Sequence, residues 1–142
     1  KILPNQFFDI QVCSDIHLRQ WKKLAINSAI NALTAIYHCK NGGLLANKNN
    51  REHINKLCDE IATIAASVGM KKIGEDLVQE VTKTLENTAE NYSSMYQDMA
   101  AKRPTEIDYI NGYLIQLAEQ RGINCDENKK IYAQIKQLEQ QY

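Results

Sequence analysis

The chain has 142 residues, enough for one domain with a substantial core, and 44% of them are hydrophobic while 24% are charged. Seventeen basic residues balance seventeen acidic ones, so the charge favours neither nucleic acid nor an anionic membrane as a partner. No apolar run approaches the roughly 20 residues of a membrane-spanning helix, and the first residues do not form a secretory signal, so we expect a cytoplasmic protein.

Apolar residues recur with the helical period of about 3.6 in nearly every segment, and no stretch alternates as a strand would. The first predicted helix begins after Ser14 and Asp15, either of which could cap it, and it ends near His38. It is apolar around most of its circumference, which predicts a central and largely buried helix.

The remaining periodic segments predict five shorter helices. They are expected at 50–68, 75–87, 93–101, from Thr105 to Arg121, and from Asp126 onward. Gly69 ends the first of these, and Thr105 is the expected N-cap of the fourth, with Glu106 and Asp108 in its first turn. The sequence therefore predicts one compact all-α domain over 1–142, with about six helices around a long central one.

Signatures of metal and nucleotide sites are missing from the sequence. The four cysteines and three histidines are dispersed without metal-ligand spacing, so we expect no metal site. No G-x-G-x-x-G follows a strand, and Gly42-Gly43 reads as a turn between helices. Nothing in the chain predicts a cradle for a dinucleotide.

A row of polar residues interrupts the apolar first helix. Lys23, Asn27 and Asn31 stand at i, i+4 and i+8, so their side chains share one face and could converge on a ligand. A lysine buried there would be costly to keep charged and could serve as a proton donor. The alternative is a solvated stripe in which Lys23 reaches water beside Lys22, and spacing alone favours that alternative.

A second group of polar residues occurs around Ser94 and Glu106. Glu106 would lie in the first turn of its helix, where the helix dipole favours a carboxylate, and simple capping explains it equally well. Ser94 has a similar alternative as a hydroxyl at a helix end. Local physics favours the capping role for both residues.

Four segments, taken in order, resemble signatures of the ketopantoate reductase (2-dehydropantoate 2-reductase) family in its C-terminal domain. Residues 21–35 resemble "W-[RK]-K-L-x-x-N-x-x-x-N-P-[LI]-T-A", and residues 90–98 resemble "N-x-S-S-M-x-x-D". Residues 105–112 match "T-E-I-[DE]-x-[IL]-N-G", and residues 122–128 resemble "G-[IV]-x-x-P-x-N". The resemblance covers roughly residues 9–140 and implies a fold like the C-terminal domain of 6-phosphogluconate dehydrogenase.

The resemblance also implies an activity and roles for residues. The family's enzymes are NADPH-dependent oxidoreductases that reduce ketopantoate to pantoate, in the biosynthesis of pantothenate and coenzyme A. Lys23 matches the lysine that donates a hydrogen bond and a proton to the keto oxygen, and Glu106 matches a glutamate that helps to position the reacting groups. Asn27, Asn31 and Ser94 match residues that bind the substrate.

The resemblance implies a missing half as well. In the family an N-terminal Rossmann domain binds NADPH, and this chain lacks it, so no cofactor-binding residue is assigned here. The chain begins with Lys1 rather than Met, as a piece of a longer protein would. We therefore expect the chain to be inactive alone, and the apolar surface that would meet its partner domain could support a homodimer.

Two departures from the family pattern and two alternatives remain. Ala32 and Asp126 stand where prolines are expected, so Asn31 could sit slightly differently. The parent enzyme could reduce a different 2-keto acid, or the chain could be a non-catalytic all-α interaction module. The presence of Lys23, Asn27 and Glu106 together argues against the module.

Overall fold

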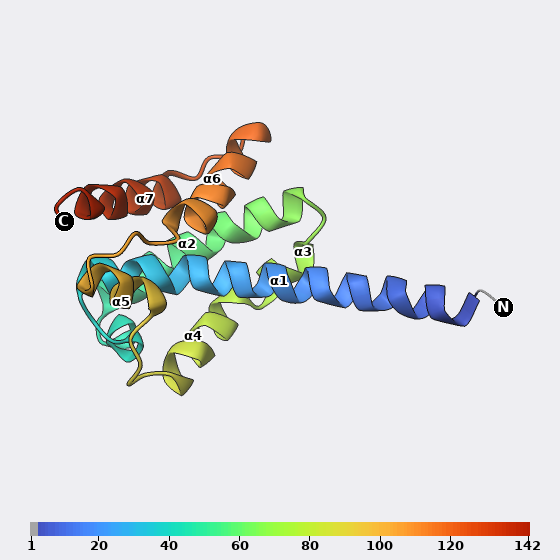
Figure 1. The fold of residues 1–142 in the computed structure, drawn as a ribbon, viewed down its shortest axis with the longest axis horizontal. Helices are drawn as coiled ribbons and strands as arrows, with labels where there is room; N and C mark the ends of the chain where they lie inside the picture. Colours follow the sequence, from blue (N-terminus) through green and yellow to red (C-terminus); the bar gives the residue numbers. More distant parts are fainter. Residues whose placement is uncertain (1–2) are drawn as a thin grey trace.

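The computed structural model describes the backbone of residues 3–142 and the side chains of residues 16–142. Within that range the chain is helical and contains no strand, which confirms the predicted all-α bundle around a long helix (Figure 1). The elements in chain order are α1 (Leu3–Tyr37), η1 (Asn41–Leu45), α2 (Lys48–Ser67), α3 (Lys71–Glu75), α4 (Leu77–Asn87), α5 (Ser94–Ala100), η2 (Ile107–Tyr109), α6 (Asn111–Gln120) and α7 (Asp126–Glu139).

Helix α1 is the axis of the bundle. Figure 1 shows α6 and α7 on one side of its C-terminal half and α4 on the other, while its first turns extend beyond the other helices. The buried part of α1 is rich in small residues, which lets the neighbouring helices approach closely. Its fully or almost fully buried apolar residues are Ala25, Ala29, Ile30, Ala32, Leu33 and Ala35. This part of α1 is the largely buried central helix that the sequence predicts.

The other helices present one apolar face each to this axis, as their periodicity predicts. Leu57, Ile61 and Ile64 of α2 are completely buried, and so are Ile131 and Ile135 of α7. Within the described part of the chain, no helix combines the length and the apolarity that crossing a membrane requires.

The predicted start of the first helix is wrong. Helix α1 begins at Leu3, so Ser14 and Asp15 lie in its interior rather than at its start. The reason is that residues 3–37 contain no glycine, and their one proline, Pro4, falls in the first turn, where the missing N–H has no helical partner to lose.

The predicted helix from Thr105 to Arg121 is also divided differently. Helix α6 begins at Asn111, because Ile110 (φ −107°, ψ −90°) departs from helical geometry and separates it from η2. Thr105 therefore does not cap α6, and Glu106 precedes a single 3₁₀ turn instead of lying in the first turn of a longer helix. The dipole argument for the charge of Glu106 does not apply.

The short helix α3 was not expected from the sequence. A Cβ on Gly74 would lie 2.6 Å from the Cβ of Ala62, so α3 sits on α2 at a distance that only glycine permits. A helix of five residues is too short to show a hydrophobic period, so no local sequence pattern predicts α3. Helix α4 accordingly begins at Leu77, two residues after the predicted start.

Candidate functional site

The row on α1 runs from solvent into the bundle. Lys23 is exposed, Asn27 is half-buried, and Asn31 is only 8% exposed. The buried lysine considered from the sequence is not found in this chain, because Lys23 lies on a part of α1 that the other helices leave uncovered. Lys23 reaches water, as the solvated alternative predicts, while the other end of the row is buried.

The two neighbouring lysines of α1 differ in their surroundings. The Nζ of Lys22 lies 3.3 Å from a carboxylate oxygen of Glu80 in α4. The ammonium of Lys23 makes no ion pair or hydrogen bond with any residue whose side chain the structure describes. It is therefore available to bind an oxygen of a ligand.

The start of α5 is tied to the inner end of the row. The Oγ of Ser93 lies 2.6 Å from the Oγ1 of Thr34 and 3.5 Å from the carbonyl oxygen of Asn31. The same oxygen caps α5 by accepting a hydrogen bond from the backbone N–H of Tyr96. Ser94, the first residue of α5, is exposed and is held beside this contact. Sequence reasoning did not single out Ser93 or Thr34, although a Ser-Ser pair before a helix is a capping signal.

The turn at Asn41-Gly42 holds the loop that leads to Ser93. The N–H of Asn41 donates to the carbonyl of Asn91 (2.9 Å), and the N–H of Gly42 donates to that of Ala89 (3.0 Å). The buried amide of Asn41 also donates to the hydroxyl of Thr88 (2.9 Å). These bonds fix the approach of the chain to Ser94.

Replacing Gly42 with alanine is expected to destabilise the domain by about 1–3 kcal/mol, because the new methyl group would overpack this turn. Its Cβ would lie 2.8 Å from the Cβ and 3.0 Å from the carbonyl oxygen of Ala89, so backbone would have to move. Denaturant unfolding measures the change. The double variant Gly42→Ala/Ala89→Gly removes the Cβ clash and should recover part of the loss; no recovery would contradict the packing argument.

Glu106 lies on a segment that runs along α1. Its carbonyl oxygen accepts hydrogen bonds from the N–H groups of Tyr109 (2.9 Å) and Ile110 (3.1 Å). Further along, the side chain of Asn111 donates to the carbonyl oxygen of Ser28, next to Asn27. The Glu106 side chain itself is exposed. The segments that carry Ser94 and Glu106 are thus tied to α1 at two points of the polar row.

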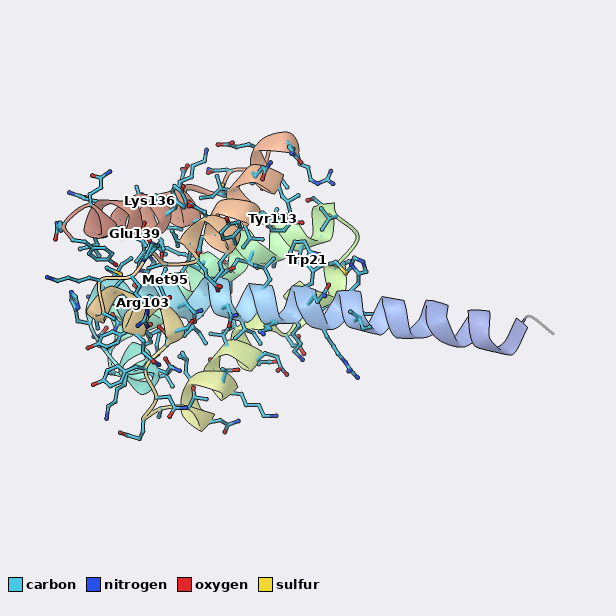
Figure 2. All side chains as sticks on the ribbon, viewed as in Figure 1. Trp21, Met95, Arg103, Tyr113, Lys136 and Glu139 are labelled. Carbon is cyan, nitrogen blue, oxygen red and sulfur yellow. The ribbon has the colours of Figure 1, made fainter. Side chains whose placement is uncertain are left out.

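Aromatic packing supports the same placement. The rings of Trp21 and Tyr113 are 6.4 Å apart between α1 and α6, and Figure 2 shows both side chains in the space between these helices. The pair holds α6 against α1 two residues before Lys23 and six before Asn27.

Helix α7 anchors the segment on both sides of Glu106 through Glu139 and Lys136, which Figure 2 labels on this helix. The carboxylate of Glu139 accepts from the N–H (2.9 Å) and the hydroxyl (2.5 Å) of Thr105. The carboxylate of Asp108 accepts from the hydroxyl of Tyr132 (2.6 Å) and the Nζ of Lys136 (3.3 Å). The hydrogen bond from Tyr132, followed by that from Lys136, lowers the pKa of Asp108.

These anchors predict that acid weakens the domain. Burial raises the pKa of Glu139, but the hydrogen bonds from Thr105 and the charge of Lys136 outweigh it, so the pKa is lowered from 4.5. A carboxylate with a lowered pKa stabilises the fold above its unfolded pKa, and that contribution is lost as the pH falls through the folded pKa. The melting temperature of Glu139→Gln should therefore fall less between about pH 5 and pH 3 than that of the wild type. The exposed change Glu86→Gln is the control. Equal slopes for Glu139→Gln and the wild type would show that this carboxylate contributes no acid-sensitive stability.

Three of the five candidate side chains lie at the surface of this chain. Lys23, Ser94 and Glu106 are exposed, and no hydrogen bond or ion pair joins the five candidate side chains to one another within the described residues. A cavity of about 330 Å³ lies elsewhere, between α1, α3 and α4, and is lined by Leu18, Lys22, Lys72, Ile73, Asp76 and Glu80 among others. A closed pocket around the row would need a second wall.

Comparisons with known proteins relate the chain to one protein family. The family described as "Ketopantoate reductase PanE/ApbA C terminal" matches residues 15–139. The 2-dehydropantoate 2-reductase of Salmonella typhi is 38% identical over 142 residues, which are 100% of this chain and 46% of the relative. The chain thus spans about half the length of the curated relatives it matches.

Solved structures show the same domain. A PanE/ApbA family ketopantoate reductase from Ralstonia eutropha JMP134 superposes with a TM-score of 0.79 at 27% identity, over 85% of this chain and 40% of that one. A D-mandelate dehydrogenase bound to NADH and anilino(oxo)acetate superposes with a TM-score of 0.84 over 89% of this chain and 42% of that one, and at 23% identity it shows the fold alone. Because the family match covers residues 15–139, nearly the whole chain, the chain belongs to the ketopantoate reductase family and corresponds to its C-terminal domain.

Proposed function

We propose that this chain is the substrate-binding and proton-donating domain of an NADPH-dependent 2-dehydropantoate 2-reductase, which reduces ketopantoate to pantoate. The observation that carries the proposal is the polar row of α1. The ammonium of Lys23, which has no partner among the described side chains, lies at its exposed end, and Asn31 lies at its buried end. A 2-keto acid has a keto oxygen and a carboxylate close together, and such a row offers donors to both.

The described residues lack the structural unit that commonly binds a dinucleotide. They contain no strand and therefore no βαβ unit whose glycine-rich turn could cradle a pyrophosphate. We propose that a separate N-terminal Rossmann domain of the parent protein holds NADPH and supplies the hydride to the keto carbon. That domain would also be the second wall that the row lacks, so this chain alone is expected to show no turnover.

Each candidate side chain has a task that its chemistry suits. Lys23 donates a hydrogen bond to the keto oxygen, stabilises the negative charge that grows there, and then supplies the proton. Asn27, Asn31 and Ser94 orient the remaining polar groups of the substrate through neutral hydrogen bonds, which add no competing charge. Glu106, on a segment anchored by α6 and α7, helps to position the reacting groups.

A comparison of substrates tests the proposal. We expect the parent protein to reduce ketopantoate with a kcat/KM at least about tenfold above that for pyruvate, because the extra groups of ketopantoate contribute binding energy. A higher kcat/KM for a smaller 2-keto acid would keep the reductase and change its substrate. Absence of NADPH oxidation with every 2-keto acid would favour the non-catalytic interaction module.

A further inference from the structure

Two buried amides of the described residues, those of Asn41 and Asn111, have an oxygen without a hydrogen-bond partner, and the second lies at the start of α6. Asn111 is completely buried, and its Nδ2 donates one hydrogen to the carbonyl oxygen of Ser28 (3.1 Å) and the other to the Oδ1 of Asn128 (3.0 Å). Its own Oδ1 is buried without a hydrogen-bond partner among the described residues. A buried amide with one unpaired oxygen is unfavourable compared with an apolar side chain of the same size. Asn111 therefore contributes through the geometry that it imposes on its hydrogen-bond partners rather than through stability.

The orientation of that amide is set from a distant helix. The carboxylate of Glu60, in α2, accepts hydrogen bonds from the backbone N–H groups of Glu127 (2.8 Å) and Asn128 (2.9 Å) and from the Nδ2 of Asn128 (2.7 Å). Because an ionised carboxylate can only accept, the Nδ2 of Asn128 must face Glu60 and its Oδ1 must face Asn111. The direction of each bond in the chain from Glu60 to Ser28 is therefore fixed, and so is the amide of Asn111.

This chain of bonds ends where the candidate site begins. Ser28 directly follows Asn27, which belongs to the polar row. At the other end, Asn111 directly follows Ile110, whose N–H donates a hydrogen bond to the carbonyl oxygen of Glu106. The carboxylate-bearing segment is thus tied to α1 through Asn111.

We infer that Asn111 is a positioning residue, which holds the Glu106 segment in register with Lys23 and Asn27, and that Asn128 and Glu60 set the direction of its amide. This inference rests on the proposed function, in which Glu106 and Lys23 act on one substrate. If Asn111 acts by positioning Glu106, its replacement lowers turnover only when Glu106 is intact. A purely structural residue would affect turnover with or without Glu106.

The first test uses a double-mutant cycle in the full-length parent protein. We expect Asn111→Ala to lower kcat/KM for ketopantoate by about tenfold to 10²-fold, since small misplacements of reacting groups have effects of this size. In the Glu106→Gln background the same change should lower it by less than about twofold, because the group it positions is already disabled. An equal factor in both backgrounds would overturn the inference. The exposed change Asn55→Ala is the matched control.

The second test does not depend on activity. Hydrogen exchange of the Tyr109 and Ile110 amides, which bond to Glu106, should be about tenfold faster or more in Asn111→Ala and unchanged in Asn55→Ala. Unchanged exchange in Asn111→Ala would also overturn the inference. If wild-type enzyme reduces no 2-keto acid, the proposed function fails, while this experiment still reports on the tie itself.

A milder variant covers the case in which Asn111→Ala does not fold. Asn128→Ala removes the acceptor that orients Asn111 and leaves the bond from Asn111 to Ser28 in place. Asn128→Ala should lower kcat/KM and speed the exchange of the Tyr109 and Ile110 amides by smaller factors than Asn111→Ala does. Its effect on kcat/KM should also vanish in the Glu106→Gln background.

Discussion

Replacing Lys23 with alanine in the parent enzyme is expected to lower kcat for ketopantoate by about 10² to 10⁴-fold, the range that general acid catalysis supplies. The reason is that, in the proposed mechanism, the ammonium stabilises the charge on the keto oxygen and is also the source of its proton. Because Lys23 makes no ion pair within the described side chains and is exposed, the change should leave the melting temperature of the domain almost unaltered. Steady-state NADPH oxidation and thermal unfolding measure the two quantities.

The neighbouring lysine provides a matched control. Lys22 is next in sequence and has the same charge, but its Nζ is paired with Glu80 of α4. Lys22→Ala should keep nearly the full kcat and lose at most about 1 kcal/mol of stability, as expected for an exposed ion pair. If both variants lost activity equally, a general effect of positive charge on α1 would explain the data better than a proton donor.

The second large effect is expected at Glu106. Glu106→Gln keeps the size of the side chain and removes its charge, and we expect kcat/KM to fall by about 10²-fold because the reacting groups lose one of their positioning contacts. The carboxylate of Asp108, two residues further, is the control, since it bonds to Tyr132 and Lys136 of α7. Asp108→Asn should alter stability and its acid dependence more than turnover. Retention of full activity in Glu106→Gln would remove this residue from the proposed mechanism.

The helices with a periodic or capping signal could be predicted from the sequence, and the five-residue helix α3 could not. Helices α2, α5 and α7 start within two residues of their predicted positions, because Asn47 and Ser93 cap the first two and Asp126 opens the third. The start of α1 was missed because a good capping residue, Ser14, occurs inside a helix that nothing interrupts. A capping residue signals a helix start only where the preceding backbone is not already helical.

Some features of the candidate site could also be predicted from the sequence, and others could not. The spacing of Lys23, Asn27 and Asn31 could be predicted from α1 alone, because one helix fixes their common face. Their gradient of burial could not, since it depends on where α5 and α6 cover α1. The contacts of Ser93 with Thr34, and of Asn111 with Asn128, join residues far apart in the chain and leave no local pattern. Roles for Lys23, Glu106 and Ser94 come from the family resemblance and remain predictions.

The measurement that tests the central claim most directly is the initial rate of NADPH oxidation by the full-length parent protein with ketopantoate, for wild type and Lys23→Ala side by side. The account predicts rapid oxidation by the wild type that requires ketopantoate and collapses in the variant. Oxidation that persists at the wild-type rate in Lys23→Ala would contradict the proton-donor assignment. A wild-type enzyme that oxidises no NADPH with ketopantoate or any other 2-keto acid would contradict the proposed reaction itself.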